Sequence, residues 1–144
     1  MRKINIVVFS LLVLTLVGCG KQASSGSNPA ARQAALESTQ AWLQHVDGGS
    51  YAKSWEEAAA IFKSAVSQAE WDKKMRAART PLGKVVSRKI KSQQYATSVQ
   101  GAPDGEYVVI QYDTVFENKA NAVETITPML DKDGKWKVSG YYIK

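Results

Sequence analysis

Apolar residues recur at helical spacing directly after the polar stretch at residues 20–28. From Asn28 onward they return every three or four positions, which is the spacing of one face of an α-helix. Asn28 can cap such a helix and Pro29 suits its first turn, whereas Asp47 and the two glycines after it end the pattern. We therefore expect a first helix over residues 29–47. Its buried face is expected to hold Ala35, Thr39, Trp42, Leu43 and Val46.

Two further apolar stripes predict a second and a third helix. Ser50 can cap the second, and Ser67 can cap the third, because Glu70 three residues later completes a capping box. Pro81 and Gly83 then end the helical half of the chain. The second stripe is Tyr51, Trp55, Ala58, Phe62 and Ala65, and the third is Trp71, Met75, Ala78 and Leu82.

After residue 83 the period of the apolar residues changes from about 3.6 to about two, which predicts β-strands. Residues 84–99 have a mixed pattern and suggest one long strand with a bulge. Three shorter strands follow, and Pro128 favours a bulge or an edge position near the end of the third strand. One face is expected to hold Val108, Ile110, Tyr112, Thr114 and Phe116 in the second strand and Trp136, Val138, Gly140 and Tyr142 in the last.

The turns between these strands are short, which predicts a four-stranded antiparallel meander. An apolar sheet face must be buried against another layer, and the three amphipathic helices can supply that layer. The sequence thus predicts a single α+β domain over residues 30–144, with three N-terminal helices packed on the sheet.

The first residues of the chain have the form of a bacterial signal peptide. Arg2 and Lys3 precede an apolar stretch over residues 4–17, and small residues follow it. As a helix this stretch would measure about 21 Å, shorter than the roughly 30 Å hydrocarbon core, so a permanent transmembrane helix is the less favoured interpretation. Its end, Leu-Val-Gly-Cys at 16–19, resembles the lipobox of bacterial lipoproteins.

The lipobox resemblance implies that residues 1–18 are removed and that Cys19 carries fatty chains such as palmitate. Two or more chains give essentially permanent membrane attachment. Residues 19–29 are expected to be the lipidated cysteine and a flexible tether, and Gly20 in place of an aspartate favours the outer membrane, facing the periplasm, in a two-membrane cell. The alternative is a spare cysteine in an ordinary signal peptide.

Short motifs are spread over the rest of the chain: Ala-Trp-Leu-Gln at 41–44, Tyr-Ala-Lys-Ser-Trp at 51–55, Pro-Leu-Gly at 81–83, Ser-Arg at 87–88, Pro-Asp-Gly-Glu-Tyr-Val-Val at 103–109, Glu-Thr-Ile-Thr-Pro at 124–128 and Asp-Gly-Lys-Trp-Lys-Val-Ser-Gly-Tyr-Tyr-Ile at 133–143. Together they resemble an uncharacterised bacterial lipoprotein family, catalogued as domain of unknown function 4019. The family resemblance implies no substrate, partner or catalytic residue. The order of the elements also resembles the cystatin-like and nuclear transport factor 2-like superfold, which implies helices packed into a curved sheet around a conical cavity.

Composition argues against several classes of function. The chain has a formal net charge of +6, but its charges are interspersed, and an exported protein without a basic tract is not expected to bind nucleic acid. Cys19 is the single cysteine, so no disulfide can form within the domain. One histidine and scattered carboxylates supply no recognised ligand spacing, and we expect neither a metal nor a cofactor.

Glu124 is the one candidate for acid–base catalysis. Strict alternation places it on one face of its strand with Ile126 and Leu130, where it can point into the concave side of the sheet. Arg88, in the first strand, can meet it there. Two other interpretations stay open: the pair is a structural ion pair, or the opposite face of the strand, with Val123 and Met129, is the buried one.

Arg88, Tyr112, Trp136 and Tyr142 are the candidates for ligand binding, although the spacing of the aromatic residues favours ordinary core packing. His45 is expected to face solvent near the end of the first helix. The favoured hypothesis is a non-enzymatic, membrane-anchored envelope lipoprotein that binds a protein partner or a small apolar ligand. The alternatives are a small-molecule isomerase or hydrolase that uses Glu124 in a conical pocket, and a purely structural envelope component.

Overall fold

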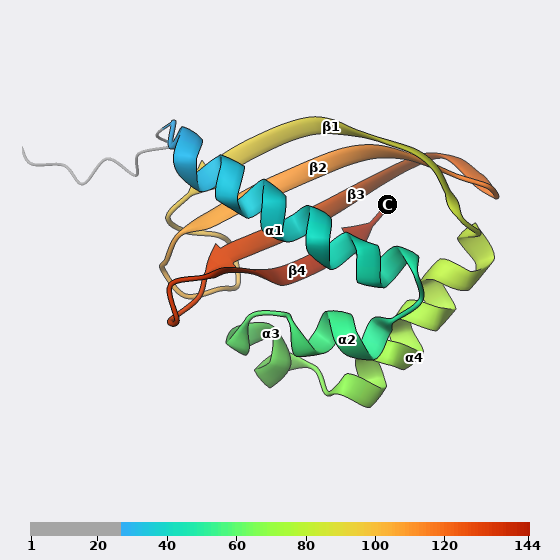
Figure 1. The fold of residues 1–144 in the computed structure, drawn as a ribbon, viewed down its shortest axis with the longest axis horizontal. Helices are drawn as coiled ribbons and strands as arrows, with labels where there is room; N and C mark the ends of the chain where they lie inside the picture. The colour runs from blue at the N-terminus through green and yellow to red at the C-terminus, as the bar shows by residue number, and fades with distance from the viewer. Residues whose placement is uncertain (1–26) are drawn as a thin grey trace, which may run out of the picture.

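The computed structural model describes residues 27–144 as one layer of helices against a four-stranded antiparallel sheet. Helix α1 crosses one face of the sheet and contacts every strand, and the shorter helices lie together beside β4 (Figure 1). The elements are α1 (Pro29–Asp47), α2 (Tyr51–Glu56), α3 (Ala60–Ala65), α4 (Gln68–Arg79), the short 3₁₀ helix η1 (Thr80–Leu82), β1 (Val85–Ala96), β2 (Tyr107–Phe116), β3 (Lys119–Leu130) and β4 (Trp136–Ile143).

The sheet confirms the predicted meander. Its strand order is β1-β2-β3-β4, and each neighbouring pair is antiparallel. Strand β1 carries two register shifts, one between Val85 and Ser87 and one between Ile90 and Ser92, which agrees with the bulge suggested by its mixed pattern. The predicted inner face of β2, from Val108 to Phe116, is buried at every second residue.

Helices α1 and α4 form where the sequence predicts them. The Asn28 side chain accepts a hydrogen bond from the Ala31 amide at 3.0 Å, and Pro29 occupies the first turn of α1. The predicted apolar face of α1 is buried. In α4, Ser67 and Glu70 form the expected capping box.

The single second helix expected over residues 51–65 is wrong, because the chain breaks between α2 and α3 at residues 57–59. The cause lies far away in the sequence. The Ala59 amide donates to the Val138 carbonyl of β4 at 2.8 Å, and the Ala60 amide donates to the Asp131 carboxylate at 3.0 Å. Ala58 and Ala59 are fully buried, so the break brings the backbone against the sheet edge.

Aromatic side chains fill the space between the helices and the sheet. Phe62 packs edge-on against Trp71 with ring centroids 4.9 Å apart, and Trp42 meets Tyr141 at 5.5 Å. The Trp42 indole donates to the Ser54 carbonyl at 2.7 Å, so this buried polar group is satisfied. The core-packing interpretation is therefore confirmed for Trp42 and Trp71, which are 2% and 6% exposed.

The alternation predicted for β4 is wrong at its end. A register shift between Thr127 and Pro128 gives β4 one extra residue opposite β3, and Tyr141 then pairs with Ile126 on the inner face. Tyr142 pairs with Thr125 on the other face and is 62% exposed. It therefore does not share a face with Val138.

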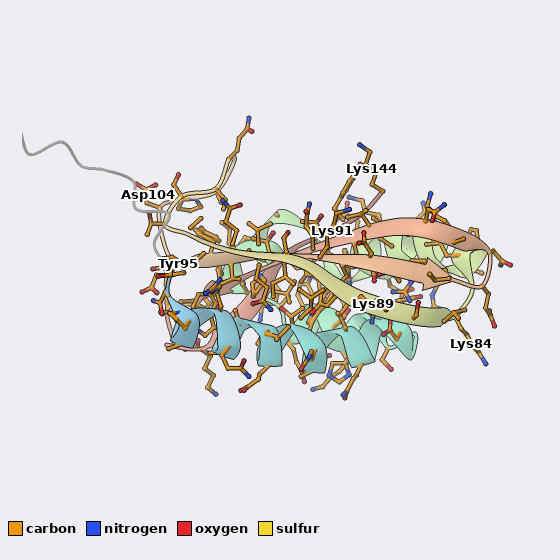
Figure 2. The ribbon with its side chains drawn as sticks, turned by 90° about the horizontal axis from the view of Figure 1, so that it is seen from above. Lys84, Lys89, Lys91, Tyr95, Asp104 and Lys144 are labelled. Atoms are coloured by element: carbon orange, nitrogen blue, oxygen red, sulfur yellow. The ribbon has the colours of Figure 1, made fainter. Side chains whose placement is uncertain are left out.

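The predicted signal peptide and Cys19, together with most of the predicted tether, lie outside the described residues 27–144. Within that range, no helix combines the length and the apolar character needed to cross a bilayer. Figure 2 shows α1 on one side of the sheet and Lys89 and Lys91 on β1, the edge strand.

Candidate functional site

Glu124 lies on the inner face of β3 and is 0% exposed. Arg88 of β1 donates to both of its carboxylate oxygens, at 2.6 Å from Nε and 3.1 Å from a terminal nitrogen. The Thr114 hydroxyl of β2 donates at 2.6 Å, and the Tyr141 hydroxyl of β4 donates at 2.6 Å. All four strands of the sheet therefore meet at this carboxylate.

A second acid and a second arginine complete the cluster from the helical side. Asp47, at the end of α1, accepts from Arg88 at 2.7 and 3.0 Å and from Arg79 of α4 at 2.9 Å. Arg79 also donates to the Tyr141 hydroxyl at 3.2 Å, and that hydroxyl in turn donates to Glu124, so the hydrogen bonds form a closed network. We call these five residues and Thr114 the Glu124 cluster. Two carboxylates and two guanidinium groups give it no net charge.

The neighbouring charges and burial shift the pKa values of Asp47 and Tyr141 within the cluster. Burial acts to raise the pKa of Asp47, but hydrogen bonds and charges from Arg88 and Arg79 outweigh it and hold that pKa below its ordinary value. Burial and the neighbouring Glu124 charge raise the pKa of Tyr141 well above its ordinary range. Tyr141 consequently stays protonated and donates its hydrogen bond to the carboxylate.

The geometry favours the structural interpretation of Glu124 over a catalytic one. A carboxylate offers about four acceptor positions, and Glu124 accepts four hydrogen bonds from Arg88, Thr114 and Tyr141. A general base needs a free acceptor position within reach of the substrate proton. Glu124 has neither a free position nor exposed surface. It holds strands together instead of facing a ligand.

An open groove of about 500 Å³ lies beside the cluster, between α1 and strands β1 and β2. Arg88 and Tyr112 both line it, so two of the four ligand-binding candidates come together there. Trp136 lies elsewhere, partly buried against the core, and Tyr142 is on the opposite face of the sheet. The residues that define the groove are Leu43, Gln44, Asp47, Arg88, Ile90 and Tyr112.

Four members of the Glu124 cluster, Asp47, Arg79, Thr114 and Tyr141, are not among the residues predicted for the site. The sequence places Asp47 only at the end of the first helix. Arg79 is 5% exposed, whereas Ala78, predicted for the buried stripe of α4, is exposed. The spacing of four residues from Trp71 to Met75 continues to Arg79, and that signal could have found it.

His45 and the carboxylates do not form a metal site in the described part of the chain. His45 faces Glu57 at the surface, with its Nε2 3.0 Å from the carboxylate. Across residues 27–144, no three histidine, cysteine, aspartate or glutamate residues come close enough to hold an ion. The absence of a cofactor stays a prediction of the sequence.

Replacing Glu124 with Gln tests its structural role. Gln cannot balance the two arginines, and breaking a buried ion pair costs about 3–5 kcal/mol, so we expect the free energy of unfolding to fall by about 3 kcal/mol. Urea unfolding followed by circular dichroism measures this change. The matched control is Glu37→Gln on the exposed face of α1, which should change stability little. Equal stability of both variants would return Glu124 to the list of catalytic candidates.

Acid should weaken the domain partly through Asp47. Because folding lowers the pKa of Asp47 from its ordinary value of 3.8, its contribution to stability is complete above that value and is lost as the pH falls below it. In urea unfolding between about pH 5 and 3, the free energy of unfolding should decline less steeply for Asp47→Asn than for the wild type. The variant should also be less stable at neutral pH. Parallel curves would contradict the proposed role of Asp47.

Comparison with known proteins places the chain in a family. No curated protein matches it, and no solved structure matches it. Residues 38–141, which contain Asp47, Arg79, Arg88 and Glu124, match the family described as "Protein of unknown function (DUF4019)". The chain belongs to this family of uncharacterised domains.

Proposed function

We propose that this chain is a lipid-anchored protein of the bacterial cell envelope whose α+β domain binds a protein partner or a small apolar ligand and does not catalyse a reaction. The observation that carries this proposal is the saturation of Glu124, whose four hydrogen bonds all come from the protein itself. An open groove lies directly beside that closed cluster. The domain therefore offers a surface for binding and no free group for acid–base chemistry at Glu124.

The anchoring part of the proposal rests on the sequence around Cys19. The lipobox-like residues 16–19 follow an apolar stretch of signal-peptide length. Between Cys19 and the start of α1 at Pro29 the chain is rich in Gly and Ser, which suits a tether that reaches roughly 16 Å on average. Gly20 supports an outer-membrane position facing the periplasm in a cell with two membranes.

The binding part of the proposal rests on the groove. Its volume of about 500 Å³ falls within the range of roughly 300–1,000 Å³ that is usual for small-molecule sites. Leu43 and Ile90 give it an apolar wall, and polar groups lie at its margins. Helices packed on one face of an antiparallel sheet also support the proposal that the fold is of the cystatin-like or nuclear transport factor 2-like kind.

Replacing Cys19 with Ala tests the anchor. We expect uncleaved precursor to accumulate, and the mature protein to disappear from the membrane fraction, because no thiol remains to carry the fatty chains. Immunoblots of fractionated cells measure both effects, and Ser25→Ala in the tether is the matched control. Unchanged fractionation and processing, or an N-terminal peptide whose mass shows a bare Cys19, would contradict the anchor.

Native mass spectrometry tests the binding role. The lipoprotein, extracted from envelopes in mild detergent, should carry a partner protein or a small molecule in stoichiometric amount. A fluorescent protein fused behind residues 1–29 shares the anchor but lacks the domain, so it should carry neither. A bare lipoprotein, or the same cargo on both proteins, would contradict a binding function of the domain.

A further inference from the structure

The groove beside the Glu124 cluster has an apolar lining, in which Leu43 is 3% exposed and Ile90 is the part that faces solvent. Leu43 belongs to α1 and Ile90 to β1, and the Tyr112 ring adds an aromatic surface. Ile90 is 48% exposed, although large aliphatic side chains are usually buried. This lining is therefore available to the apolar part of a ligand.

The Tyr112 hydroxyl has an unmet hydrogen bond. The Tyr112 side chain is 4% exposed and lines the groove, and its hydroxyl has no hydrogen-bond partner among the described residues. Buried hydroxyl groups without a partner are uncommon in proteins because they lose hydration without a replacement. Burial raises the pKa of Tyr112, so its hydroxyl is protonated and can donate to an acceptor. A ligand with an acceptor group can supply the missing partner.

The charges at the groove favour an anionic acceptor. Asp47 is the one acid that lines it, and both of its oxygens accept hydrogen bonds from Arg79 and Arg88. Arg88 also lines the groove, and four of its five N–H donors are used in hydrogen bonds to Asp47 and Glu124. One N–H of Arg88 is therefore left for a ligand. A carboxylate can accept from that donor, whereas an ammonium group cannot.

We propose that this groove is a binding site for a small amphiphile with an apolar body and a carboxylate. The apolar body lies on Leu43 and Ile90, and the carboxylate accepts hydrogen bonds from the Tyr112 hydroxyl and from the remaining N–H of Arg88. The head group reaches the hydroxyl by displacing exposed side chains at the margin, of which Gln44 is one. This inference rests on the proposed binding function and names its site and its ligand class.

The test uses hexanoate and hexylammonium, which share a chain and differ in the sign of the head group. The full lipoprotein in lipid nanodiscs is titrated with each probe, empty nanodiscs serve as the blank, and NMR follows the methyl groups of Leu43 and Ile90. Hexanoate should shift these signals saturably with a Kd of about 1 mM or below. Hexylammonium should bind at least about tenfold more weakly.

Two pairs of variants locate the site. Tyr112→Phe removes only the hydroxyl and should weaken hexanoate binding about tenfold, whereas Tyr142→Phe on the outer face should leave it unchanged. Ile90→Glu should abolish binding, and Val86→Glu, on the same strand but outside the groove lining, should not. Tyr112→Phe should also unfold at a higher temperature, because it removes a buried group without a partner.

Equal binding of the two probes, or wild-type affinity of Tyr112→Phe, would overturn the inference. So would hexanoate shifts confined to outer-face methyl groups such as those of Val109. If hexanoate fails to bind while native mass spectrometry finds a cargo on the lipoprotein, this inference fails and the proposed binding function stands. If neither probe nor cargo is bound, both fail.

Discussion

The buried carboxylate of Glu124 joins the four strands of the sheet through hydrogen bonds from Arg88, Thr114 and Tyr141. Glu124 is 0% exposed, so an unpaired negative charge there would be very unfavourable. The positive charge of Arg88 compensates it, with Nε 2.6 Å from a carboxylate oxygen. Arg88 in turn holds Asp47, and Asp47 holds Arg79. The end of α1 and the end of α4 are thereby tied to the sheet. A buried pair adds little net stability over an apolar one, but it specifies which elements must meet.

The same cluster separates the two functional hypotheses. Glu124 and a tyrosine do lie together, as a catalytic pair would. The tyrosine is Tyr141, however, and its hydroxyl already donates to Glu124 and accepts from Arg79. The open space lies on the other side of Arg88, between α1 and β1. Because Asp47 fixes the end of α1 to Arg88, the cluster also sets one end of the groove. The closed cluster and the open groove beside it therefore arise from one arrangement.

Tertiary contacts overruled the local pattern at identifiable places. Nothing in the sequence of residues 51–65 breaks a helix, since the stretch contains neither Pro nor Gly. The break comes from hydrogen bonds to Val138 and Asp131, and both residues are more than seventy positions away in the sequence. On β4, one extra residue near Ser139 reverses which tyrosine faces the core. A register shift of one residue cannot be predicted from the periodicity of a single strand, because it is defined by the pairing with the neighbouring strand.

The elements with a local cause could be predicted from the sequence: the caps of α1 and α4, the alternation along β2 and the antiparallel meander. For β3 the sequence left two faces open, and the structure shows that the face with Glu124 is buried and meets Arg88. The sequence did not predict that Asp47, Arg79 and Tyr141 join them, because those residues come from two helices and an edge strand whose approach depends on packing. Local propensity acts over a few residues, whereas a buried cluster is defined by contacts between distant segments.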